Sequence, residues 1–120
     1  MAIIRSATLE SSKLRSSVRF QANIDMQFES RELNSEWELK MRLYEDDTFR
    51  DDDLRSEATR RFRPSSTSTS LQLERSVSKS RVDTEFGDEE VYAKISLVPL
   101  ESPKPFASDS ANTGIEVVNE

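Results

Sequence analysis

The chain has 120 residues and a formal net charge of −6. This suits a single domain and opposes binding to nucleic acid or anionic lipid, because both need Lys and Arg to neutralise phosphate. It contains neither cysteine nor histidine, so disulfides, thiolate chemistry and histidine-based catalysis or metal binding are excluded.

The N-terminal residues predict a weak first strand. Its apolar positions are Ile3, Ala7 and Leu9, and residues 11–17 are expected to form the loop that follows. Residues 1–5 lack the apolar stretch of a signal peptide, and no apolar run approaches the roughly 20 residues of a transmembrane helix. We therefore expect a cytoplasmic protein, unless a leader has been removed from this chain.

The strongest pattern is a strict alternation of apolar and polar residues between positions 18 and 28. Its apolar members are Val18, Phe20, Ala22, Ile24, Met26 and Phe28. A period of two predicts a half-buried strand. The pattern returns at Trp37, Leu39, Met41 and Leu43, after a polar connection at 30–36. We interpret these segments as an antiparallel pair of strands, each with one wet face.

Further strands are predicted downstream. A short one at 58–63 ends at Pro64, and the Ser/Thr-rich residues 65–70 form a loop. The apolar positions then change from odd at Leu71, Leu73 and Val77 to even at Val82, Thr84 and Phe86. That change of face requires a bulge or a turn near 78–80. The last clear strand carries Val91, Ala93, Ile95 and Leu97 and ends by Pro99.

Six to eight short strands without a helical crossover predict an all-β fold. We expect an antiparallel β-sandwich, immunoglobulin-like or similar, with a small β-barrel as the alternative. The sandwich domain should cover residues 1–100. Residues 101–120 should form a polar C-terminal tail, to which 115–118 add at most a short edge strand.

An acidic segment follows the strand that begins at Trp37. Glu45, Asp47, Asp51 and Asp53 supply carboxylates, the hard oxygen ligands that calcium prefers, and calcium tolerates irregular loops. We therefore take these four residues as candidate calcium ligands. The other interpretation is a solvated acidic loop that keeps the strand end soluble.

The same segment resembles the second calcium loop of phospholipid-binding domains of the synaptotagmin and protein kinase C type. Glu45, Asp47, Phe49, Asp53 and Leu54 match that loop in order, over about a dozen residues. The first acid of the family is Asp rather than Glu, and residues 55–56 replace an apolar residue and Gly. The resemblance would imply calcium-dependent docking to anionic lipid, with 88–90 as the second acidic loop.

Two other features have structural interpretations. The cations Arg55, Arg60, Arg61 and Arg63 could grip a phosphate or an acidic partner, but neutralisation of the adjacent acidic loop is simpler. Residues 88–92 resemble the Asp-x-x-x-Tyr corner of immunoglobulin-like domains, with Tyr92 as the corner tyrosine and Trp37 in the core. This resemblance concerns the fold and not the function.

The sequence therefore predicts no enzyme. We expect a non-catalytic protein-interaction or structural assembly module that presents loops and sheet edges to a protein partner or to further copies of itself. It should need no cofactor and bind no nucleic acid. The alternative is a calcium-dependent lipid- or ligand-binding β-sandwich that uses the acidic loop at 45–53, and peripheral membrane contact is expected only in that case.

Overall fold

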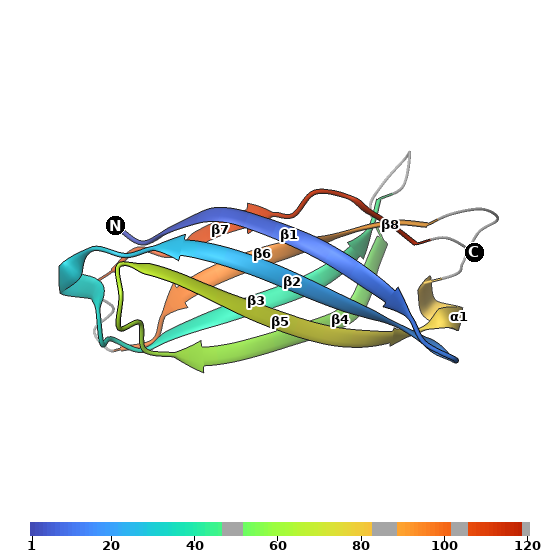
Figure 1. Cartoon of the computed structure of the whole chain (residues 1–120), viewed down its shortest axis with the longest axis horizontal. Helices are drawn as coiled ribbons and strands as arrows, with labels where there is room; N and C mark the ends of the chain where they lie inside the picture. The colour runs from blue at the N-terminus through green and yellow to red at the C-terminus, as the bar shows by residue number, and fades with distance from the viewer. Residues whose placement is uncertain (47–51, 83–88, 102–105, 119–120) are drawn as a thin grey trace.

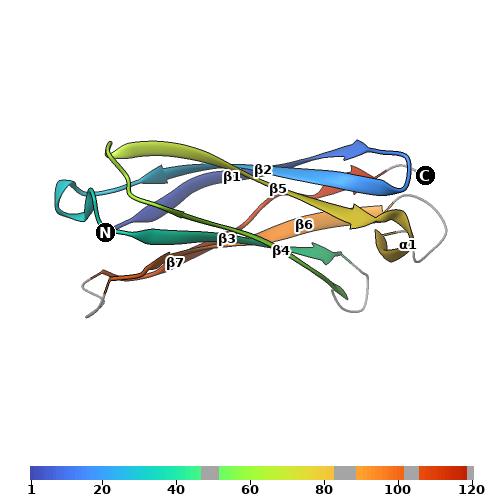
Figure 2. The same cartoon turned by 90° about the horizontal axis from the view of Figure 1, so that it is seen from below.

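The computed structural model describes residues 1–46, 52–82, 89–101 and 106–118. Two antiparallel sheets face each other, as Figures 1 and 2 show. The smaller sheet contains β1 (Ile3–Lys13), β2 (Ser17–Gln27) and β5 (Ser68–Ser78). The larger contains β3 (Trp37–Glu45), β4 (Asp52–Phe62), β6 (Glu89–Pro99), β7 (Asp109–Asn112) and β8 (Glu116–Val118). The predicted all-β antiparallel sandwich is confirmed.

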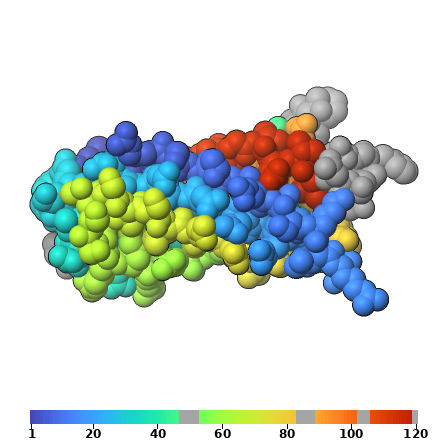
Figure 3. Space-filling model, viewed as in Figure 1, coloured from blue at the N-terminus to red at the C-terminus, as the bar shows by residue number. Residues whose placement is uncertain are grey.

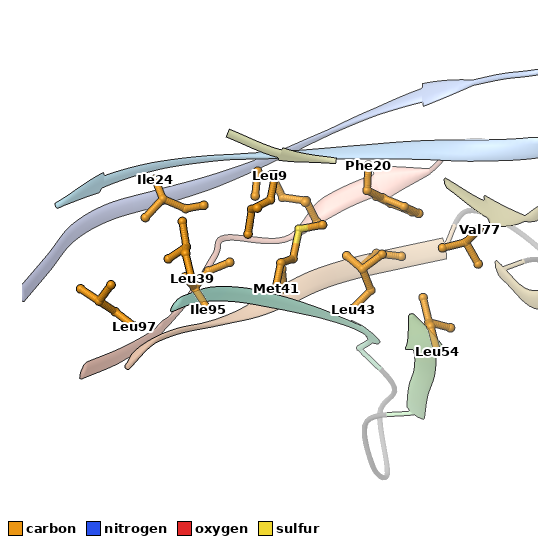
Figure 4. Close-up of a cluster of buried hydrophobic side chains, with 14 of the residues drawn as sticks. Leu9, Phe20, Ile24, Leu39, Met41, Leu43, Leu54, Val77, Ile95 and Leu97 are labelled. Atoms are coloured by element: carbon orange, nitrogen blue, oxygen red, sulfur yellow. The ribbon is translucent and has the colours of Figure 1, made fainter. Parts of the chain in front are cut away.

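The core lies between the two sheets. Every apolar residue of the alternating runs in β2, β3 and β6 is buried there. In Figure 4, Phe20 and Ile24 of β2 extend toward Leu39 and Met41 of β3 and Ile95 of β6. The sole tryptophan, Trp37, is fully buried and contacts Phe28 edge-on, with ring centroids 5.4 Å apart. The predicted faces of these strands are therefore confirmed.

The predicted pairing of the second and third strands is wrong. β2 pairs with β1 and β5, whereas β3 pairs with β4 and β6. The connection between them includes the short 3-10 helix η1 (Ser30–Glu32) and Asn34, whose φ is 64°. This connection carries the chain from one sheet to the other. The apolar faces of β2 and β3 therefore meet across the core instead of lying side by side.

The first and fourth strands are longer than predicted. β1 continues through residues expected in a loop, and the hairpin closes where the Leu14 amide donates to the Ser17 carbonyl over 2.8 Å. β4 begins six residues before its predicted start. The first half of β4 does not show the alternation of apolar and polar residues that marks a regular strand, because the strand bulges there. Arg55 has a φ of 55°, and the register with β3 shifts between Arg42 and Tyr44.

The expected turn after β5 is present as the short helix α1 (Lys79–Val82), which buries Val82. Beyond residue 100, the polar segment contributes two strands to the larger sheet, β7 and β8, both paired with β6. β7 and β8 are too short to show a recognisable alternation of apolar and polar residues in the sequence. Their contacts with β6 and β1 hold them in place. Among the described residues, no helix has the length and apolar character needed to span a bilayer.

Candidate interaction surface

The acidic hairpin between β3 and β4 contains the predicted calcium ligands. Asp47 and Asp51 lie outside the described residues. Glu45 ends β3 and is buried on the side of the strand that faces the core. Asp53 is the register partner of Tyr44, so its side chain lies on the opposite, outer face. The structure does not bring Glu45 and Asp53 together, and the four-residue calcium site stays a prediction.

Asp53 is held by an arginine that the sequence reasoning did not single out. Arg42 Nε lies 2.9 Å from Asp53 Oδ2, and the same guanidinium contacts Glu57. The hydrogen bonds from Arg42 hold the pKa of the Asp53 carboxyl below its ordinary value, helped by the Arg55 amide. Knowing that Arg42 lies opposite Glu57 would have pointed to the role of Arg42. That register depends on the bulge in β4, so it cannot be deduced from the sequence.

The predicted cations do not act as one cluster. Arg63 pairs with Glu36 and Glu101, and Arg61 lies 3.7 Å from Glu38. These partners belong to other parts of the fold, not to the adjacent acidic loop. Within the described ranges, no set of three or more acidic side chains is grouped as a metal ion would require.

The outer face of the larger sheet carries a tyrosine pair. Tyr44 of β3 and Tyr92 of β6 are register partners and stack with centroids 5.7 Å apart, and the Lys94 ammonium lies 4.6 Å from the Tyr44 centroid. Tyr92 is buried, but its strand neighbours Val91 and Ala93 are the ones that enter the core. The resemblance to a tyrosine corner is therefore limited to the sequence, since Tyr92 faces away from the core.

Sheet edges are where a β-sandwich can accept another chain, because edge strands carry unpaired backbone groups. The edge of β1 is covered by carboxylates. The Ile4 amide donates to Asp109 and the Ser11 amide donates to Glu116, each over 2.8 Å. β7 and β8, which supply these carboxylates, have four and three residues, too short to template a partner strand.

The edge of β4 is protected in a different way. The strand bulges, and the Arg55 amide donates to Asp53 over 2.8 Å within the same strand. Two exposed arginines, at positions 60 and 61, also lie within the strand. Bulges and charges of this kind are known to block strand addition.

β5 differs from these strands. It is eleven residues long and pairs with β2 in an unbroken register from end to end. It contains no proline, glycine or lysine, and its charged residues are Glu74 and Arg75. β4 is its neighbour on the open side of the sandwich, but no ladder joins the described residues of β4 and β5. Figure 3 shows β5, in yellow-green to yellow, running along the surface beside β2.

The register reveals which backbone groups of β5 face outward. The Phe28 amide donates to Thr67 and the Lys79 amide donates to Ser16, one at each end of the β2–β5 ladder. Hydrogen-bonded pairs alternate along an antiparallel ladder, so the odd-numbered residues of β5 bond to β2. The even-numbered residues direct N–H and C=O away from β2. We call them the β5 edge: Ser68, Ser70, Gln72, Glu74, Ser76 and Ser78.

A recess of about 470 Å³ opens beside the β5 edge. Ser70, Leu71 and Gln72 line it from β5, Asn23, Ile24 and Asp25 line it from β2, and Arg60 lines it from β4. Asp25 accepts hydrogen bonds from Ser70 over 2.5 Å and from Ser6 over 2.8 Å. These two hydroxyls, Ser70 most strongly, lower the pKa of Asp25.

Comparison with known proteins identifies the fold. No family model and no curated protein matches the chain. Among solved structures, it is similar to a bacterial adhesin from Mobiluncus mulieris that contains intramolecular disulfide, isopeptide and ester bond cross-links. The TM-score is 0.62 at 11% identity, over 99% of this chain and 49% of the adhesin. The chain thus spans about half the length of that adhesin, and the likeness shows a shared β-fold.

Proposed function

We propose that this protein is a non-catalytic interaction module that binds an extended segment of a partner protein as an additional strand along the β5 edge. The observation that carries the proposal is the contrast between β5 and the other edges. β1 is covered by Asp109 and Glu116 and β4 is bulged, whereas the described β5 edge is long and regular and has neither device.

The chemistry of the β5 edge supports this proposal. Its outward N–H and C=O groups would complete a ladder with an incoming backbone, which gives affinity independent of sequence. Its side chains are mostly small hydroxyls and are exposed, so they leave room for a neighbouring strand. The similarity to an adhesin fold is compatible with a binding role.

The test begins with peptides selected for binding to the folded domain from a random library displayed on phage. Their binding should shift the amide NMR signals of Ser70, Gln72, Glu74 and Ser76 more than those of β1 or β4. Gln72→Pro should abolish binding, because proline removes an outward N–H without removing a bond to β2. Gln72→Ala keeps the N–H and should bind normally.

A second measurement covers the case in which Gln72→Pro perturbs the fold. The selected peptide is N-methylated either on the alternate residues that face β5 or on those that face away. The first form should lose binding and the second should keep it. Equal binding by both forms, or signal changes elsewhere on the surface, would overturn the proposal. A concentration-dependent dimer in light scattering that Gln72→Pro abolishes would identify the partner as a second copy.

A further inference from the structure

A second surface lies on the outer face of the larger sheet, which does not contain β5. A recess of about 280 Å³ opens there along β6, between β3 and β7. The register arranges its polar side chains in two rows across these strands, with Lys40, Ser96 and Ser110 in one and Arg42, Lys94 and Asn112 in the other. Ser96 is the small central member of its row, so the floor is low at this position. We call this surface the β6 recess.

Cations line the β6 recess, although the whole chain has a net charge of −6. Among the described residues, no Asp or Glu lines it. Arg42 is compensated by Asp53 and Glu57 of β4. Lys40 and Lys94, by contrast, form no ion pair with any described residue. Two positive charges without a counter-charge therefore lie at this recess.

The described acids closest to the β6 recess are engaged elsewhere or too far away. Glu38, on the same face of β3, lies 3.7 Å from Arg61. Asp109 of β7 is on the opposite side of its strand, where it accepts a hydrogen bond from the Ile4 amide over 2.8 Å. Glu90 shares the outer face of β6 but is four residues, or about 13 Å, from the lysine of that strand. The described part of the fold thus leaves both lysines without a neutralising partner.

Lys94 is held in place without losing its charge. Its ammonium lies 4.6 Å from the centroid of the Tyr44 ring, a cation–π contact that orients the ammonium but adds no counter-ion. Arg42 lies directly opposite Lys94 across the ladder between β3 and β6, and like charges in that position are unfavourable. A bound anion would relieve this repulsion and form charge-assisted hydrogen bonds with Lys94 and Lys40. The geometry therefore suits an anionic group.

Neutral polar side chains complete the β6 recess. Ser96, Ser110 and Asn112 can each donate and accept a hydrogen bond, and no hydrogen bond to another described residue occupies their side chains. Hydroxyl groups, which also donate and accept, are their natural partners, whereas an acidic peptide would leave them unused. The volume is at the lower end of the range for ligand sites, which fits one sugar ring.

From this combination of groups, we infer that the β6 recess binds a saccharide whose ring carries a carboxylate or a sulfate. The anion contacts Lys40 and Lys94, and the ring hydroxyls bond to the three neutral side chains. This inference does not rest on the proposed function, because the β6 recess and the β5 edge belong to different sheets.

The test is an NMR titration of the intact chain with four small probes: glucose, glucuronate, glucose 6-sulfate and inorganic sulfate. Glucuronate and glucose 6-sulfate should shift the amide signals of Ser96, Ser110 and Asn112 at millimolar concentration. Glucose lacks the anion and inorganic sulfate lacks the ring, so each should bind about tenfold more weakly, a difference of about 1.4 kcal/mol. Comparison of the two anionic sugars shows whether carboxylate or sulfate is preferred.

Variants locate the binding. Lys40→Gln and Lys94→Gln should each weaken binding of the anionic sugars about tenfold. Lys13→Gln is the matched control, because it removes the same charge from an exposed lysine at the end of β1, in the other sheet. Ser96→Val fills the floor of the recess without changing the charge and should abolish binding. Fluorescence of Trp37 checks that every variant remains folded.

Several results would overturn the inference. An equal loss of affinity in Lys13→Gln and Lys40→Gln would mean that only the overall charge matters. Glucose that binds as tightly as glucuronate would exclude recognition of the anion, and inorganic sulfate that binds as tightly as the sugars would exclude recognition of the ring. A tetraglutamate peptide that binds more tightly than both anionic sugars would identify an acidic peptide as the ligand. Gln72→Pro should leave sugar binding unchanged, so this test and that of the β5 edge fail separately.

Discussion

The Ile4 amide of β1 donates a hydrogen bond to the Asp109 carboxylate of β7 over 2.8 Å, although the two residues are 105 positions apart. The Ser11 amide makes the equivalent bond to Glu116. These two contacts lie at opposite ends of β1, on the side where the two sheets come together. They satisfy backbone donors that would otherwise face solvent along that edge.

We predict that removing both carboxylates, with Asp109→Ala and Glu116→Ala together, exposes β1 as a second open edge. Each lost bond should cost about 1 kcal/mol of unfolding free energy, measured by urea denaturation. Light scattering should also detect more self-association than the natural chain shows at the same concentration. Asp109→Asn retains an acceptor oxygen and should stay close to the natural chain. A double variant with unchanged stability and unchanged self-association would show that the contacts do not guard the edge.

A second prediction concerns the two faces of β2. Ile24→Asp should prevent folding, because it places an unpaired charge in a core where Ile24 is fully buried. The adjacent change Asp25→Asn should have little effect on stability, since Asp25 is exposed and Asn can still accept a hydrogen bond. Fluorescence of the sole tryptophan, the buried Trp37, reports the unfolding of each variant. Similar losses for both would contradict the assignment of faces.

The titration of Asp25 gives a third prediction. Hydrogen bonds from Ser70 and Ser6 lower its pKa from an ordinary 3.8. A carboxyl whose pKa is lower in the folded state stabilises the fold above its unfolded pKa, and that stabilisation is lost as the pH falls through the folded pKa. Ser70→Ala should therefore raise the pKa of Asp25 in an NMR titration and weaken the chain near neutral pH relative to strongly acidic pH. An unchanged pKa would show that the Ser70 contact does not persist in solution.

The fourth prediction tests the calcium alternative. Since Glu45 is buried on the core side and Asp53 pairs with Arg42 on the outer side, we expect millimolar calcium to leave the melting temperature unchanged relative to a chelator. A bound ion would stabilise the native state and raise that temperature. An increase that Glu45→Gln abolishes would instead establish a calcium site at this hairpin.

Much of the fold could be predicted from residue order alone. The alternation at 18–28 and 37–43 identified two strands and assigned each side chain to the core or the solvent. This succeeds because the period of two is a local property of a pleated backbone with one buried face. It failed for the first half of β4, where the bulge at Arg55 interrupts the period, and for the short strands β7 and β8.

The candidate site was less accessible to such reasoning. The sequence placed Glu45 and Asp53 in one acidic loop, but the bulge and the register of β3 with β4 assign them to opposite faces. Arg60 looked like one member of a basic run, yet its pairing opposite Leu39 directs it toward the open side of the sandwich. Neither position can be deduced from spacing, because both depend on a register between strands.

By itself, the sequence determined that this chain forms strands, which side chains of its alternating runs are buried, and that chemistry based on cysteine and histidine is absent. Only the tertiary structure decided that β2 pairs with β5 rather than β3, that carboxylates cover β1, and that no described strand forms a ladder on the other side of β5. The physical reason is that alternation is set by neighbours two residues apart. Strand pairing and edge protection depend instead on contacts between segments far apart in the chain, such as Ile4 and Asp109.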